Sequence, residues 1–312
     1  MTFSSTEVAL EGFRLIRRRP VSALVWALAW ILLGYGALWA LLTMATPQLF
    51  HEAAALPDLR TQPRAAFAGI IQLELGLFRS LGPWLLWAWI VGTVLVAGVY
   101  RAVIEPRNNG FAYLRLGGDE LRLLLLSIIL GVLWAVFLFA SIAAGAGLFM
   151  ATSQLVQPAQ GLLDVAIVLV LVCLALIIPV RLSLAGPMTF ARKRLQILDS
   201  WGLTRGRFWR LVGLYVLVTV FIWVVAMVLS AVREVLTAGP MQGVMVEMYQ
   251  HPGDPGRMFV RMLQTMSELR SNPLLIAALA VQGVADSVIR VVAAAPVAAA
   301  YRALAGDGQG AH

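Results

Sequence analysis

The sequence predicts an all-α polytopic membrane protein with six transmembrane helices in a single membrane domain, residues 1–312. Composition is the first indication, because 60% of the residues are hydrophobic and 13% are charged, against about 25% charged residues in soluble proteins. Six apolar runs are the second, since each reaches the roughly 20 helical residues that cross a bilayer. They cover residues 21–44, 83–103, 123–150, 162–184, 211–236 and 273–300. Backbone polar groups in lipid must pair within each run, so we expect helices.

The basic residues predict how these spans are oriented. Sixteen of the 24 Lys and Arg residues and seven acidic residues fall on the side of the N-terminus, a net charge of +9. The opposite side has seven basic and eight acidic residues, a net charge of −1. Positive charge stays on the cytoplasmic face, so we expect both termini in the cytoplasm. Charge spread along a membrane boundary favours anionic lipid as a partner over nucleic acid.

Three segments on the N-terminal side suggest an internal repeat. Each has an aromatic residue followed four positions later by Arg, shortly before a span. The pairs are Phe13 with Arg17, Phe111 with Arg115, and Trp201 with Arg205. This spacing places both side chains on one helix face, so we predict three copies of an amphipathic helix followed by a transmembrane hairpin. Convergence is the alternative, because many cytoplasmic helix entries hold aromatic and basic residues.

The two longer external loops have the pattern of amphipathic helices, over residues 65–81, 241–250 and 258–270. The second loop holds a stripe of methionines at spacings of three and four, with one histidine. Its members are Met241, Met245, Met248, His251, Met258, Met262 and Met266. Thioether sulfur is a soft ligand, so the stripe could bind Cu(I). The favoured interpretation is an adaptable apolar face against lipid or a partner helix, with no metal and no cofactor.

The most basic segment runs from Phe190 to Tyr215. Within its residues 190–210, six basic residues are interspersed with four aromatic residues, which is typical of the lipid headgroup layer. We expect anionic lipid to contact Arg192, Lys193, Arg194, Arg205, Arg207 and Arg210. A role in membrane anchoring and topology alone is the alternative.

The same region carries a family resemblance. The stretches RLSLAGPMTFARKR (residues 181–194) and DSWGLTRGRFWRL (residues 199–211) resemble a group of bacterial inner-membrane proteins. These are related to the membrane domain that accompanies some glycerophosphodiester phosphodiesterases. The close match covers residues 179–215, and elsewhere the six-span pattern agrees. The resemblance implies a fold and a compartment, but that membrane domain has no established catalytic residues to transfer.

The sixth span holds the most unusual polar residues. Gln282, Asp286 and Arg290 recur at intervals of four, so they line one helix face near the middle of the membrane. Ionisable groups there usually face the interior of a helix bundle and often mark function. Asp286 and Arg290 are also spaced to pair with each other as a structural clip, and both interpretations stay open. Small residues beside them, such as Gly283, favour close helix contacts.

Candidate catalytic groups are few. Cys173 is the single cysteine, which excludes an intrachain disulfide or a cysteine metal site. No phosphate-binding loop and no nucleophilic triad is evident. We therefore expect a non-catalytic membrane module that binds lipid or a partner protein, a second copy of the chain being one such partner. A transporter of a small molecule or lipid with a polar path along the sixth span is the alternative, and a membrane-embedded enzyme is the third choice.

Overall fold

The computed structural model describes residues 4–57, 59, 61–107, 110–152, 159–251, 254–268 and 271–309, and all secondary structure within them is helical. Six helical stretches in these ranges are long and apolar enough to span a membrane. They are Pro20–Leu41, Pro63–Ile104, Gly110–Thr152, Gly161–Arg192, Phe208–Gln250 and Pro273–Ala305. The prediction of an all-α polytopic membrane protein is confirmed. The chain divides into two compact units, residues 1–18, 96–220 and 292–312, and residues 19–95 and 221–291.

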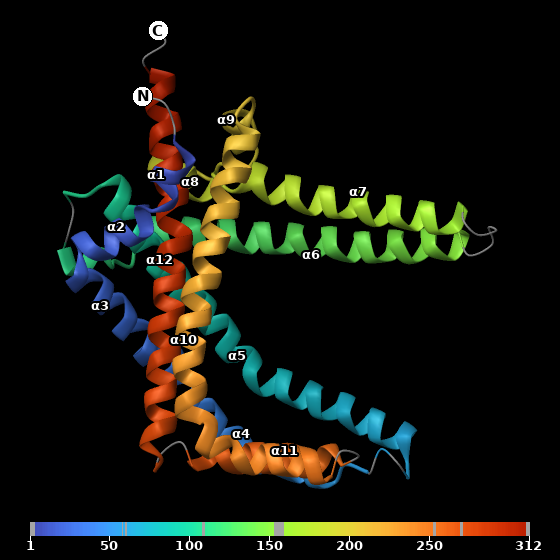
Figure 1. Cartoon of the computed structure of the whole chain (residues 1–312). Coiled ribbons are helices and arrows are strands. Elements are labelled where there is room, and N and C mark those ends of the chain that lie inside the picture. The colour runs from blue at the N-terminus through green and yellow to red at the C-terminus, as the bar shows by residue number, and fades with distance from the viewer. Residues whose placement is uncertain are drawn as a thin grey trace. The chain divides into compact units, whose positions relative to one another are not determined.

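The first unit is built from short helices and one long hairpin (Figure 1). Its own elements are α1 (Ser5–Ala9), α2 (Glu11–Arg18), η2 (Gly110–Tyr113), α6 (Gly118–Thr152), α7 (Ala159–Leu182), α8 (Ala185–Arg192) and α9 (Asp199–Thr204). It also includes the C-terminal part of α5 (Pro63–Ile104), the N-terminal part of α10 (Phe208–Gln250) and the C-terminal part of α12 (Pro273–Gln309).

The hairpin of α6 and α7 runs side by side along its length in Figure 1. At its far end the Thr152 hydroxyl donates to the Asp164 carboxylate at 2.6 Å. Large apolar side chains such as Val136, Phe139 and Leu169 are exposed along both helices. Apolar surface on this scale is what a lipid-facing helix presents.

The proposed repeat of amphipathic helices is only partly helical. Phe13 and Arg17 share α2, but Phe111 lies in a left-handed turn in which three successive residues have φ of 46°, 52° and 66°. That turn is held by tertiary contacts, because the buried Arg101 donates to the Tyr113 carbonyl and pairs with Glu120 on α6. Arg205 has extended backbone after α9. The aromatic residue and the arginine therefore share one helix in the first pair, and they do not in the other two pairs.

The second unit contains the site predicted on the sixth span. Its own elements are α3 (Pro20–Ala29), the π-helix η1 (Trp30–Tyr35), α4 (Gly36–Ala54) and α11 (Pro255–Ser267). The remaining parts of α5, α10 and α12 complete it. Residues 65–81 and 241–250 are helical as predicted, but they continue the spans of α5 and α10 without a break. The third predicted segment is helical from residue 258 to 267 in α11, and its residues 269 and 270 lie outside the described residues.

A small apolar core fixes the loop end of the second unit. Leu49 and Ala53 from α4 pack with Leu73 from α5 and Leu263 from α11, and all four are buried. Burial of such side chains contributes about 1.5–3 kcal/mol each for the larger ones. The loop helices are thus packed against one another and form a scaffold.

Candidate functional site

The site begins with the π-helix η1 in the first span. The N–H of Gly36 donates to the carbonyl of Ile31, five residues back, as a π-helical turn requires. In an α-helix, residues 30 and 35 would point about 140° apart, because each residue turns about 100°. The wider turn instead brings Trp30 and Tyr35 onto the same face. Single π-helical turns of this kind are frequent at functional sites.

Two indole groups from α5 stabilise this turn. Trp84 donates from Nε1 to the Gly34 carbonyl at 2.8 Å, and Trp87 donates to the Leu33 carbonyl at 2.7 Å. Backbone carbonyls of an irregular helix need donors when water is absent. The two tryptophans provide those donors, so the π-helix depends on residues 50 and 54 positions away in the sequence.

Asp286 on α12 is surrounded by neutral donors. Its Oδ2 accepts from the Tyr35 hydroxyl at 2.6 Å and from Trp30 Nε1 at 3.3 Å. Its Oδ1 accepts from Gln282 Nε2 at 2.8 Å. A charged group removed from water is costly unless hydrogen-bonded, and these three donors meet that need. Asp286 is thereby held without a direct ion pair.

Gly283 lets α12 approach η1 closely enough for these bonds, and Gly34 leaves room for the Trp30 ring within η1. A Cβ on Gly283 of α12 would overlap the Ile31 side chain, and a Cβ on Gly34 would meet the Trp30 ring at 3.3 Å. Glycine is therefore required for η1 to lie directly against α12. The close contact predicted for Gly283 is confirmed.

Arg290 lies one helical turn beyond Asp286 on α12. Its guanidinium carbon is 3.8 Å from the centre of the Trp30 ring, a cation–π contact, and Trp30 is 3% exposed. Gly92 of α5 makes room for it, since a Cβ there would be 3.0 Å from Arg290 Nη1. Arg290 Nε is buried with no hydrogen-bond partner among the described residues.

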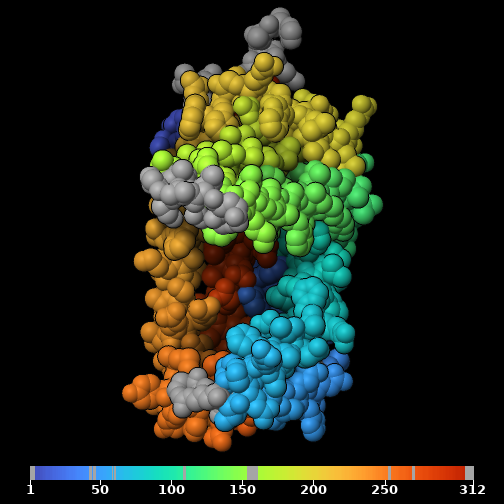
Figure 2. All heavy atoms as spheres, turned by 90° about the vertical axis from the view of Figure 1, so that its right-hand side faces the viewer, coloured from blue at the N-terminus to red at the C-terminus, as the bar shows by residue number. Residues whose placement is uncertain are grey.

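A second arginine reaches the same group of residues from α10. Arg233 Nη1 donates to Gln282 Oε1 at 3.1 Å, so Gln282 links Arg233 to Asp286. We call Trp30, Tyr35, Arg233, Gln282, Asp286 and Arg290 the α12 cluster. Figure 2 shows the second unit hollowed between α10 (orange) and α5 (teal), with α12 (red) at the floor of the hollow.

Sequence reasoning located half of the α12 cluster. Gln282, Asp286 and Arg290 lie together as predicted, but the described residues include no ion pair between Asp286 and Arg290. The physical reason is that Tyr35, Trp30 and Gln282 occupy the Asp286 oxygens. Trp30 and Tyr35 were missed, because their five-residue spacing matches no α-helical face.

The basic segment of the first unit is partly engaged by protein groups. Lys193 Nζ lies 2.6 Å from Asp119 and 3.6 Å from Glu105, and Arg192 donates to Gln196 at 2.8 Å. Arg194, Arg205 and Arg210 are exposed. Lipid contact by the segment stays a prediction.

Sequence reasoning overlooked Arg181, which lies beside this segment at the end of α7. Its guanidinium lies over the rings of Trp201 and Phe208, 5.4 and 5.2 Å from their centres. It also donates to the Thr204 hydroxyl at 3.2 Å.

The methionine stripe does not form an evident metal site. Both ring nitrogens of His251 have protein partners, Glu247 at 2.9 Å and Arg257 at 3.3 Å. Met245, Met248 and Met266 are exposed, whereas Met241, Met258 and Met262 are half-buried. Within the described ranges, no three His, Cys, Asp or Glu side chains are placed to hold a metal ion. Copper binding stays a prediction.

Comparisons with protein-family models, with curated proteins and with solved structures give no match to this chain.

Proposed function

We propose that this chain is a non-catalytic integral membrane protein that binds an anionic lipid at the α12 cluster. The observation that carries the proposal is Arg290, a guanidinium inside a span that contacts the Trp30 ring and whose buried Nε has no hydrogen-bond partner among the described residues. Ionisable groups at this depth are retained mainly where they pair or serve a function. A lipid phosphate would complete the pairing of Arg290.

The charges of the α12 cluster favour an anion. Asp286 is held by three neutral donors, and Arg233 lies 3.9 Å from the exposed Glu234. Arg290 is left as the cation whose Nε has no hydrogen-bond partner among the described residues. A guanidinium offers five N–H donors and can bind two oxygens of a phosphate in parallel. The cation–π contact with Trp30 fixes its position before a ligand arrives.

A lipid suits this position better than a free ion. The cluster lies on spans whose outer surfaces are apolar and exposed, and the hollow between α10 and α5 offers a path from the bilayer (Figure 2). A charged soluble ligand would have to give up its hydration to reach the same place. An amphiphile can keep its chains in lipid while its headgroup meets Arg290.

We also propose a bacterial inner membrane with both termini in the cytoplasm. The support is the net charge of +9 on the N-terminal side against −1 on the other side. A partner protein or a second copy of the chain stays a prediction.

Lipid transport is the second candidate, and one observation favours it. Gln282, Asp286 and Arg290 follow one face of α12 over two turns, and Arg233 of α10 reaches Gln282. Such a row could pass a headgroup along the hollow. Proteoliposomes with fluorescent phosphatidylglycerol in the inner leaflet separate the two functions, because movement to the outer leaflet requires transport, whereas a static site leaves the label inside.

Replacement of Arg290 by Gln tests the binding proposal. The variant keeps a polar side chain but loses the charge-assisted bond, which contributes about 1.5–3 kcal/mol, so retention of phosphatidylglycerol should weaken by about 10- to 150-fold. Native mass spectrometry of the purified protein counts the retained lipid. Arg79→Gln is the charge-matched control, because Arg79 is exposed on α5 away from the cluster. Equal retention by Arg290→Gln and the wild type would refute the site.

A further inference from the structure

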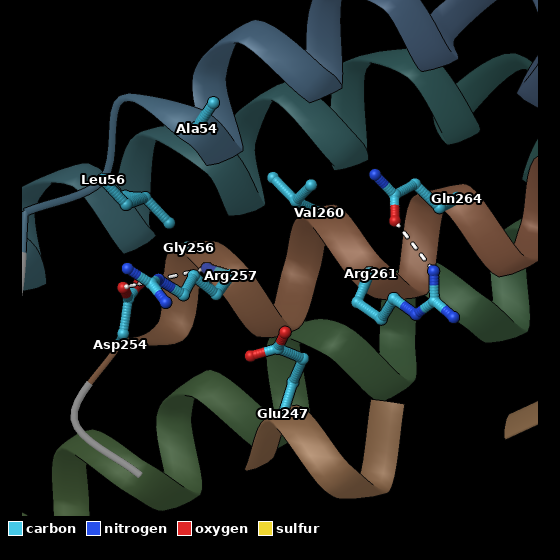
Figure 3. A pocket seen from close by; sticks show the side chains of 9 residues that line it. All are labelled: Ala54, Leu56, Glu247, Asp254, Gly256, Arg257, Val260, Arg261 and Gln264. Atoms are coloured by element: carbon cyan, nitrogen blue, oxygen red, sulfur yellow. Dashed lines mark hydrogen bonds and ion pairs between the residues drawn. The ribbon is translucent and has the colours of Figure 1, made fainter. Parts of the chain in front are cut away.

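A second site lies at the loop end of the second unit, where α4, α10 and α11 meet. A pocket of about 360 Å³ lies there, within the size range of small-ligand sites, and Figure 3 shows the side chains that line it. Its polar wall consists of Glu247, Asp254, Arg257, Arg261 and Gln264. Leu56 and Val260 form part of its apolar wall. The α12 cluster contributes no residue to it.

The pocket stands on a rigid frame. Asp254 caps α11 by accepting from the backbone N–H of Arg257 at 3.0 Å. Gly256 brings α11 against α4, because a Cβ at that position would lie 2.7 Å from the Ala53 carbonyl. Ala53 and Leu56 belong to the small apolar core of the loop helices. The polar side chains are therefore carried by packed helices and not by a free loop.

One cation in the pocket is already neutralised. Arg257 Nε lies 3.0 Å from Asp254 Oδ2, and its Nη1 lies 3.3 Å from His251. The other ring nitrogen of His251 is 2.9 Å from Glu247 Oε2. These contacts account for Asp254, Arg257 and one oxygen of Glu247.

Arg261 has no carboxylate partner in the described part of the chain. Its Nη1 donates to Gln264 at 3.2 Å, and its guanidinium lies against Gly243 of α10, where a Cβ would come within 2.5 Å of its Nε. In Figure 3 the Glu247 carboxylate points into the space between Arg257 and Arg261. The pocket thus presents an unneutralised cation and a carboxylate oxygen without a hydrogen bond.

We propose that this pocket binds a phosphoethanolamine group, with the phosphate on Arg261 and the ammonium on Glu247. A guanidinium matches phosphate oxygens in a bidentate manner, and a carboxylate accepts the ammonium N–H donors. A lipid headgroup, whose phosphodiester and ammonium carry one charge each, satisfies both side chains at no change in net charge. The source is a membrane lipid or the free compound.

Membrane lipid is the favoured source, because the adjacent surface of α10 is apolar. Met245, Val246 and Tyr249 are exposed there, Tyr249 to 88%, on the same helix as Glu247. Aromatic and flexible apolar side chains at the end of a span are typical of the bilayer interface. A lipid headgroup would enter the pocket while its chains lie along α10.

Native mass spectrometry in detergent tests the lipid source with phosphatidylethanolamine and phosphatidylcholine. Both have the phosphate, but the quaternary ammonium of phosphatidylcholine has no N–H for Glu247. We expect the wild type to prefer phosphatidylethanolamine, and Arg261→Gln and Glu247→Gln each to weaken that binding about tenfold, equivalent to about 1.4 kcal/mol. Arg79→Gln and Glu74→Gln, both exposed on α5, are matched controls that should bind as the wild type does.

Calorimetry with free phosphoethanolamine tests the soluble source. If the free compound binds and the lipid does not, the pocket is assigned to a soluble ligand of the same chemistry. Gly243→Ala keeps every charge while displacing Arg261, so it should weaken binding even if Arg261→Gln unfolds. Equal affinity for the two lipids, or wild-type affinity in the variants, overturns the proposal. Arg290→Gln should leave phosphatidylethanolamine binding at the loop-end pocket unchanged. The proposal for this pocket can therefore be refuted independently of the proposal for the α12 cluster.

Discussion

Tyr35 makes the shortest hydrogen bond to Asp286, at 2.6 Å, and its role can be tested without changing any charge. Tyr35→Phe removes the hydroxyl and keeps the ring. A hydrogen bond to a charged group contributes about 1.5–3 kcal/mol, so we expect the free energy of unfolding to fall by that amount. Thermal unfolding in detergent measures it, with Tyr249→Phe as the control, because Tyr249 is 88% exposed. An unchanged melting temperature for Tyr35→Phe would mean that Asp286 does not depend on this donor.

The residues of the α12 cluster that lie on one regular helix could be predicted from the sequence, whereas those contributed by other helices were missed. Gln282, Asp286 and Arg290 follow the i, i+4 rule on one helix, so they could be recognised as a group. Arg233 is near the end of its span and was assigned to the opposite membrane surface. Only the packing of α10 against α12 shows that it reaches Gln282.

The element on which the α12 cluster depends is the π-helix η1. A π-helical turn contains one residue more than the α-helical turn it replaces, so deletion of one residue should restore a continuous α-helix. We predict that deleting Gly36, whose N–H closes the π-helical turn, leaves Trp30 and Tyr35 five positions apart in an α-helix and so turns them onto different faces. Phosphatidylglycerol retention should then fall as in Arg290→Gln, while helix content by circular dichroism stays unchanged.

A matched deletion controls for the shortening of the span. Removing Val21, which is 72% exposed at the start of α3, shortens the same span but leaves the π-helical turn in place. Lipid retention should stay at the wild-type level in that variant. If both deletions reduce retention equally, span length and not the π-helix is what the site requires.

The elements differ in how far they could be predicted, and the reason is the range of the contacts that form them. The spans were predicted because lipid requires local backbone pairing. The π-helix has carbonyls bonded to Trp84 and Trp87, and the left-handed turn at Tyr113 is held by Arg101. Both depend on partners elsewhere in the chain, which local spacing does not reveal.

For the whole molecule, the orientation in the membrane decides which side each site faces. An odd number of candidate spans separates the N-terminus from each segment that lines the loop-end pocket of α4, α10 and α11, so we predict that the pocket lies on the other side of the membrane, outside the cytoplasm. Reversal would bring a net charge of +9 to the outer side, against the tendency of short basic loops to stay inside. If the orientation were reversed, the pocket would face the cytoplasm and would not be accessible to an external ligand.

Cysteine labelling tests this orientation directly. Cys173 is the only cysteine, so Cys173→Ser gives a background into which Leu198→Cys or Glu268→Cys is introduced, both at exposed positions. We expect a membrane-impermeant maleimide added to spheroplasts to label position 268 at once and position 198 only after the membrane is opened. The opposite labelling pattern would mean that the orientation is the reverse of the predicted one and that the loop-end pocket faces the cytoplasm. Because α10 is the only candidate span in the described residues between these positions, equal labelling of both would instead contradict its passage through the membrane.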